Sequence, residues 1–218
     1  MSRLLLIPCS GSKEPVVDGN KYWSPVRPGS MSYPSETFPD RLTGSIRYTM
    51  QKTRDGVRKR FSDRWNREGG MYYALNLYTG ITYQVPHFKW HVWKALKRGW
   101  HVLIVSGGYG IILPNERSHK YNVTINETWR FYKTPVELAI KNYIYTYQIQ
   151  EIYISLSQNY RMVLPAAFPV PTWWFVPKVS GMRARREVPY QIGYEVKHLL
   201  KRDAPNDIWT KVEPGKMA

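Results

Sequence analysis

The sequence has little cysteine, few acidic residues and no long apolar run. Its one cysteine, Cys9, excludes an intramolecular disulfide, so a reducing compartment is the natural setting. No run of about 18 apolar residues occurs, which argues against a membrane-spanning helix. Only Met1, Ser2 and Arg3 precede the first apolar segment, too few for a signal peptide. We therefore expect a cytoplasmic protein without a membrane partner.

The shortage of acidic residues leaves a strong positive charge. Lys and Arg number 32 against 16 Asp and Glu, and the net charge is +16. Such an excess indicates which partners a chain meets rather than how it folds. Polyanions are the usual partner, because binding neutralises phosphates and releases counterions. A solvated basic surface without a specific partner is the alternative. We expect DNA as the partner and a monomeric protein.

Two apolar segments, Leu4–Ile7 and Val102–Val105, are typical of buried parallel strands, because four aliphatic residues follow one another without alternation. Each runs into a turn of small residues, Pro8–Lys13 and Ser106–Gly110. In open α/β sheets, ligands bind beyond the carboxyl ends of the strands. The two turns therefore predict one shared pocket. They match neither a P-loop nor the GxGxxG fingerprint, so we expect no ATP, NAD or other cofactor.

The rest of the chain alternates helical and strand patterns. Residues 14–45 are rich in Pro, Gly and Ser and predict a long loop. The other predicted elements are a basic helix over 46–67 within an insertion at 46–70, a short strand or turn over 74–78, a helix over 85–98 stopped by Gly99, a helix over 135–148, a strand over 151–156, a short helix over 157–167, a strand over 173–176 and a helix over 190–202. This order predicts an α/β fold with a mainly parallel sheet flanked by helices, as a single compact domain over residues 1–218.

The basic helix is the first candidate for a DNA-binding face. Its expected inward stripe consists of Tyr48, Val57, Phe61 and Trp65. Arg54, Arg58 and Lys59 would then lie on the outer face, where they could contact phosphates. A merely solvated helix face is the alternative. Arg183 and Arg185, in the aromatic and basic C-terminal third, are further candidates for DNA contacts.

Several short motifs occur in an order that resembles one known group of proteins. They are Ile7–Lys13, Leu77-Tyr78-Thr79-Gly80, Val105–Gly110 with Leu113-Pro114, Tyr121-Asn122, and Ser157 with Tyr160. The order over about residues 3–165 resembles the YaaA-like families. This resemblance implies an α/β body with a DNA-binding cleft and, in related enzymes, chemistry at the N-glycosidic bond of modified bases. Phage-defence DNA glycosylases of the Brig type, which remove glucosylated hydroxymethylcytosine, are similar in kind. The chain departs from the pattern at Asn122, where an Asp is frequent.

Base excision needs phosphate contacts, a stacking surface and a group that orients water. The phosphate-binding candidates are Ser10, Gly11, Ser12 and Lys13 together with the backbone of Gly107 and Gly108. Tyr78 and Tyr109 are candidates for stacking on the base, and Tyr121 accompanies them in the substrate-binding set. Glu116 and Asn122 are the catalytic candidates, ahead of Asn126, Glu127, Asp18 and Glu36. For each of these residues, an ordinary surface, turn or core role is the alternative.

These observations favour a DNA glycosylase that excises a modified base and leaves an abasic site. A non-catalytic DNA-binding protein that protects DNA under stress is the first alternative. A nucleoside transferase in base hypermodification is the second. His87 and His91 are four residues apart, as some metal ligands are, but no CxxC or HExxH motif accompanies them, so we expect no metal site.

Overall fold

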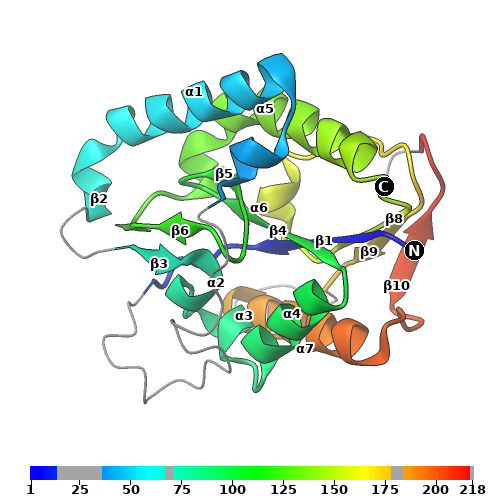
Figure 1. The fold of residues 1–218 in the computed structure, drawn as a ribbon. Helices are drawn as coiled ribbons and strands as arrows, with labels where there is room; N and C mark the ends of the chain where they lie inside the picture. The colour runs from blue at the N-terminus through cyan, green and yellow to red at the C-terminus, as the bar shows by residue number, and fades with distance from the viewer. Residues whose placement is uncertain (14–35, 67–70, 178–183, 217–218) are drawn as a thin grey trace.

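A six-stranded, mostly parallel sheet forms the centre of the computed structural model, which describes residues 1–13, 36–66, 71–177 and 184–216 (Figure 1). The strands lie in the order β10-β9-β8-β1-β4-β5. Their bounds are β1 Arg3–Pro8, β4 His101–Ser106, β5 Gly110–Ile112, β8 Glu151–Ile154, β9 Thr172–Phe175 and β10 Trp209–Val212. The four central strands are parallel, and the edge strands β5 and β10 pair antiparallel. The predicted α/β class with a mainly parallel sheet is thereby confirmed.

Helices lie on both sides of this sheet. In Figure 1, α1 (Gly44–Arg60) and α5 (Ile125–Thr146) pack together above it, and α3 (Ile81–Gln84), α4 (Phe88–Lys97) and α7 (Ala184–Arg202) pack together below it. Shorter elements are the helices α2 (Ala74–Leu77) and α6 (Gln158–Arg161), the 3₁₀ turns η1 (Phe38–Arg41) and η2 (Ser62–Arg64), and the ribbons β2 (Trp65–Asn66) with β7 (Lys120–Tyr121) and β3 (Tyr72–Tyr73) with β6 (Arg117–Ser118). Among the helices in the described ranges, none has the length and apolar character needed to cross a membrane.

The central strand β1 is buried on both faces, as its aliphatic run predicts. Leu4, Leu5, Leu6 and Ile7 are all fully buried. Residue Leu6 lies between Leu103 of β4 and Ile154 of β8 in the parallel register. Because helices cover both faces of the sheet, a polar side chain could not be solvated on either face. This explains why apolar and polar residues do not alternate along β1.

Several predicted boundaries are wrong for identifiable reasons. Residues 74–78 do not form a strand, since Ala74–Leu77 is a short helix. Helix α5 begins ten residues before the predicted start at 135, because Thr124 and Glu127 form a capping box and Pro135 is accommodated inside the helix. Helix α7 likewise starts before its proline, at Ala184. The predicted stop at Gly99 is confirmed, and its φ of +86° is the left-handed conformation that favours glycine.

Helix α1 buries a different face from the one that we predicted. Its buried residues are Met50, Arg54 and Val57. Tyr48, which we expected inside, is 67% exposed. The helix ends at Arg60, short of the predicted 67. The predicted loop over 14–45 falls mostly outside the described residues, and its last part contains η1 and the start of α1.

Candidate functional site

Three segments that are distant in the sequence meet at the side chain of Tyr121. The Nζ of Lys13, in the turn after β1, lies 4.1 Å from the centre of the Tyr121 ring. A Cβ on Gly108, in the turn after β4, would lie 2.7 Å from ring carbons of the same tyrosine. Lys13 also forms an isolated β-bridge with Tyr78 of the Leu77–Gly80 motif. The two turns therefore lie close together, as predicted, although the cavity at Lys13 is lined by residues of the first turn and by none of the second.

A chain of hydroxyl groups holds the Tyr121 ring in place. The hydroxyl of Tyr121 lies 2.8 Å from that of Tyr78 and 2.6 Å from the Oγ of Ser106. The Ser106 Oγ in turn accepts a hydrogen bond from the backbone N–H of Tyr109. Burial raises the pKa of both Tyr78 and Tyr121 well above the usual value, so both phenols are neutral. The platform beneath Lys13 is thus rigid and uncharged.

Lys13 is a buried cation without a carboxylate partner in the described part of the chain. Its side chain is 5% exposed and lies against the faces of Tyr121 and Tyr78. Desolvation lowers the pKa of the Lys13 amine, and the nearby Lys120 lowers it further, whereas Cys9 opposes the shift. Aromatic faces compensate a buried ammonium only in part. An incoming anion would therefore find a cation that is not already neutralised.

Beside Lys13 is a cavity of about 570 Å³, within the range typical of ligand sites. It is lined by Gly11, Ser12, Lys13, Asp63, Arg64, Trp65, Asn66, Lys120, Tyr121 and Asn122. The turn after β1 forms one wall, and the β2–β7 ribbon forms the other. Three cations, one carboxylate and two exposed amides, those of Asn66 and Asn122, thus face a common space. Among the predicted site residues, Gly11, Ser12, Lys13, Tyr121 and Asn122 lie here together.

Five residues of this cavity were missed by the sequence reasoning: Asp63, Arg64, Trp65, Asn66 and Lys120. We expected Arg64 and Trp65 inside a continuous basic helix, but the helix ends at Arg60 and β2 follows. Trp65 then stacks on Tyr121, with ring centres 5.4 Å apart. The backbone N–H of Asn122 donates to the carbonyl of Arg64 at 3.0 Å. Only the two-residue length of β2 and β7 hid this pairing, since neither has a readable strand pattern.

The first turn is closed by Ser10 and Gly80. The Ser10 Oγ accepts a hydrogen bond from the backbone N–H of Ser12 at 3.1 Å. A Cβ at Gly80 would lie 2.0 Å from that oxygen, so the Leu77–Gly80 motif needs glycine at its last position. The Ser12 carbonyl accepts from the N–H of Thr79 at 3.1 Å. Ser10 thus shapes the turn, while Gly11 and Ser12 remain exposed at the cavity.

The glycines of the second turn have a structural role that we did not predict. A Cβ at Gly107 would lie 2.4 Å from the backbone carbon of Thr124, where α5 begins. The carbonyls of Gly107 and Gly108 accept hydrogen bonds from Thr128 and Tyr132 of α5. Both glycines are buried. The expectation that their backbone approaches a ligand is wrong in this structure, because α5 and Tyr121 occupy that space.

The two predicted stacking residues do not present their rings to the cavity. Tyr78 is fully buried and Tyr109 is 3% exposed. Tyr109 packs edge-on against Trp65 and Tyr121. The expectation of base stacking on these two rings is therefore wrong. Their position at the ends of strands was correct, but hydrogen bonding and packing of the phenols placed them beneath the site.

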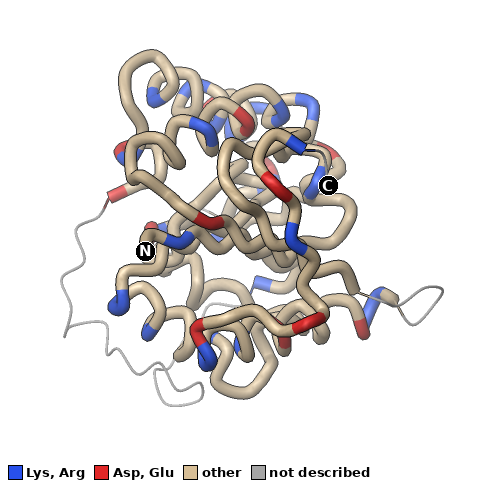
Figure 2. Tube along the Cα trace, turned by 90° about the vertical axis from the view of Figure 1, so that its right-hand side faces the viewer, with Lys and Arg blue, Asp and Glu red and all other residues tan. Residues whose placement is uncertain are grey.

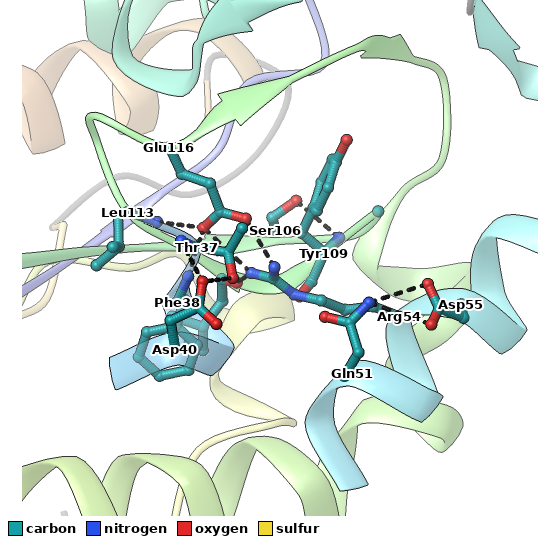
Figure 3. A network of polar contacts seen from close by, with 12 residues as sticks. Thr37, Phe38, Asp40, Gln51, Arg54, Asp55, Ser106, Tyr109, Leu113 and Glu116 are labelled. Atoms are coloured by element: carbon teal, nitrogen blue, oxygen red, sulfur yellow. Dashed lines mark hydrogen bonds and ion pairs between the residues drawn. The ribbon is translucent and has the colours of Figure 1, made fainter. Parts of the chain in front are cut away.

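Glu116, a predicted catalytic residue, and Arg54, a predicted DNA contact, form a buried ion pair (Figure 3). Arg54 Nη1 lies 2.7 Å from Glu116 Oε1, and the two residues are 3% and 2% exposed. The other carboxylate oxygen accepts hydrogen bonds from the backbone N–H groups of Phe38 and Leu113. Arg54 further donates to the carbonyls of Tyr109 and Ile111. Both predictions are wrong, because these charges tie η1, α1 and the β5 region together and do not face solvent.

The other residues that we predicted to contact DNA differ in their exposure to solvent. Lys59 and Arg185 are exposed, and Arg58 is half-buried beside Tyr109. Arg183 lies outside the described residues. Figure 2 shows Lys and Arg distributed over both the upper and the lower part of the molecule. DNA contact by these residues stays a prediction.

Two of the four weaker candidates for orienting water, Glu127 and Glu36, have other roles. Glu127 accepts hydrogen bonds from the N–H and hydroxyl of Thr124, which lower the pKa of its carboxyl, and it pairs with Arg64. Glu36 pairs with Arg41. Asn126 is exposed in the first turn of α5. Asp18 lies outside the described residues.

Cys9 lies where the chain order of the sheet reverses, between the carboxyl ends of β1 and β8. Its Sγ is 3.4 Å from the hydroxyl of Tyr160, the tyrosine of the Ser157–Tyr160 motif. The same hydroxyl donates to the Cys9 carbonyl at 3.3 Å. Tyr160 therefore packs against Cys9, and neither residue lines the Lys13 cavity.

No group of three or more His, Cys, Asp or Glu side chains with metal-binding geometry occurs within the described ranges. His87, which we considered with His91, precedes α4 in a left-handed conformation and is not part of the helix. Comparison of the chain with known protein-family models and with curated protein sequences finds no match to either.

Proposed function

We propose that the protein binds DNA and hydrolyses the N-glycosidic bond of a modified nucleotide extruded into the Lys13 cavity. The observation that carries this proposal is the cavity lining, in which three cations, Lys13, Arg64 and Lys120, occur with a single carboxylate, that of Asp63. A volume of about 570 Å³ is suited to one extruded nucleotide rather than to a helix. The order of motifs that resembles the YaaA-like families and the net charge of +16 point the same way. We treat residues 1–218 as one domain.

The roles follow from the chemistry of each group. Lys13 would hold a phosphate next to the extruded nucleotide, because its ammonium lies over aromatic faces and has no carboxylate partner in the described ranges. Asp63 would stabilise the positive charge that develops on the sugar and take a proton from the attacking water. The water oxygen bonds to C1′ as the bond from C1′ to the base breaks. The electron pair of the broken bond leaves with the base, and the proton that Asp63 took from the water passes to the departing base. Asn122 would orient the water through its amide, since an amide cannot accept the proton.

The test uses DNA duplexes that each carry one modified cytosine or thymine, glucosylated hydroxymethylcytosine among them. Incubation with the protein followed by alkali converts abasic sites into strand breaks. We expect breaks with wild type and a loss of at least about tenfold in rate for Asp63→Asn and Lys13→Met, in keeping with the usual contribution of a proton-transfer group. Methionine retains most of the apolar stem of Lys13. Lys141→Ala, on the exposed side of α5, is the matched control.

Intact strands with every modified duplex would refute the proposal. Wild-type rates in both variants would refute the assigned roles. Unfolding curves of the variants, recorded in parallel, separate a lost function from a lost fold.

A non-catalytic DNA-binding protein is the second candidate. The observation in its favour is that Glu116, the acidic residue nearest the glycine turn in sequence, is paired with Arg54 and so does not serve as a catalytic carboxylate. This alternative predicts DNA binding that weakens steeply with salt but yields no abasic product. Asp63→Asn should then leave affinity for DNA unchanged or increase it, since a negative charge is removed.

A further inference from the structure

A second cavity, of about 580 Å³, lies between α4 and α7 and shares no lining residue with the Lys13 cavity. It is lined by His87, Trp90, His91, Lys94, Arg98, Leu200 and Lys201. None of these lining residues is acidic. The two helices lie side by side below the sheet in Figure 1. We call this feature the α4–α7 groove.

Cations and aromatic rings lie together in the groove. Trp90, Lys94 and Arg98 are four residues apart, so they form one line along α4 and its end. The Lys94 Nζ lies 4.7 Å from the centre of the Trp90 ring. On α7, the groove is lined by Leu200 and Lys201. Positive charge interleaved with rings is the arrangement by which proteins hold single strands of nucleic acid.

The positive charge of the groove is largely unopposed. In the described part of the chain, Lys94 and Lys201 form no ion pair, and Arg98 meets only Asp203, at 3.9 Å. Burial, together with surrounding cations led by Lys197, lowers the pKa of His91 to about 4. The imidazole is therefore neutral near pH 7, chiefly because it is desolvated and in part because cations surround it. A site with this potential attracts phosphates.

We propose that the α4–α7 groove binds a segment of single-stranded nucleic acid, with phosphates at Lys94 and Lys201 and a base against Trp90. A duplex would bring the phosphates but would keep its bases stacked inside. The half-buried indole of Trp90 would then touch nothing in the ligand. A single strand satisfies both parts of the lining. This inference is independent of the proposed N-glycosidic chemistry.

The test measures binding of a fluorescently labelled thymidine oligonucleotide by anisotropy over a series of salt concentrations. The oligonucleotide is unmodified, so no excision is involved. We expect Trp90→Leu to weaken binding by about tenfold, because stacking on an aromatic ring is removed while apolar bulk is kept. The double variant K94A/K201A should reduce the slope of log affinity against log salt by roughly 0.7 for each phosphate that the protein no longer neutralises.

The matched control is K133A/K141A, which removes the same charge from α5 on the opposite side of the sheet. The salt slope of K133A/K141A should change by less than half as much as the slope of K94A/K201A. A slope that changes equally in both double variants would overturn the proposal, because only net charge would then matter. Unchanged affinity in Trp90→Leu would overturn it too, since the site would hold phosphates alone. Excision by these variants is scored separately, so the glycosylase proposal can fail while this one stands.

Discussion

Replacing Glu116 by Gln separates a structural role from a catalytic one. One carboxylate oxygen accepts from Arg54 Nη1 at 2.7 Å, and the other accepts from the N–H groups of Phe38 at 2.9 Å and Leu113 at 3.1 Å. An amide has one oxygen and one NH₂ group. Whichever way it is turned, the NH₂ group meets a donor. The substitution therefore removes the charge opposite a buried guanidinium and leaves at least one donor without an acceptor.

The magnitude follows from the burial of the pair. Removing one partner of a buried ion pair typically costs about 3–5 kcal/mol, because the other charge stays in a medium that solvates it poorly. For a chain of this size, each kcal/mol lowers the melting temperature by roughly 3 °C. We therefore expect Glu116→Gln to melt about 9–15 °C below wild type. The double variant in which Arg54 is also replaced by Met should recover part of that loss.

Thermal unfolding followed by circular dichroism measures the effect. Glu127→Gln is the control: Glu127 is an exposed carboxylate that caps α5 and pairs with Arg64, and its loss should cost about 1 kcal/mol. The reasoning is refuted if Glu116→Gln melts within about 3 °C of wild type, a shift of roughly 1 kcal/mol. If Glu116→Gln keeps a melting temperature close to that of wild type but loses N-glycosidic activity, Glu116 is a catalytic residue.

Three further predictions test other parts of the structure. The pKa of Lys89 is lowered to about 8 by burial, so the unfolded chain binds more protons than the native one above that pH. The free energy of unfolding, measured by urea titration, should therefore rise between pH 8 and 10.5, and Lys89→Met should flatten the rise; a slope identical in both proteins would show that Lys89 is not desolvated. Gly107→Ala should destabilise the protein by about 2 kcal/mol or more, since its Cβ would meet the backbone at the start of α5, whereas Gly56→Ala in α1, where nothing lies within 4 Å, should stabilise it by about 0.5–1 kcal/mol. Equal effects of the two glycine substitutions in urea unfolding would contradict the packing argument. Replacing Arg58 and Lys59 by Ala should weaken binding to duplex DNA and reduce its salt slope if α1 contacts phosphates, and an unchanged slope in the same anisotropy assay would place the duplex elsewhere.

The sequence by itself determined the parts of the fold that depend on near neighbours. Uninterrupted aliphatic runs such as Leu4–Ile7 can be stable only where both faces are covered, which made the strand recognisable and the sheet parallel. Gly99 ended its helix for a local reason, the left-handed conformation after α4. The meeting of the two turns also followed, because parallel strands bring their carboxyl ends to one edge.

Only the tertiary structure decided which polar residues face a ligand and which support the fold. Arg54 could be on the outside of its helix by spacing alone, but an acceptor set made of Glu116 and two carbonyls from β5 and its preceding turn draws it inward. Lys13 gained its position from Tyr121, more than a hundred residues away in the chain. The pairing of β2 with β7 brought Asp63 and Lys120 to the cavity although both strands are too short to have a pattern. Such contacts depend on interactions between residues that are far apart in the sequence, and the periodicity of residues along the chain carries no information about them.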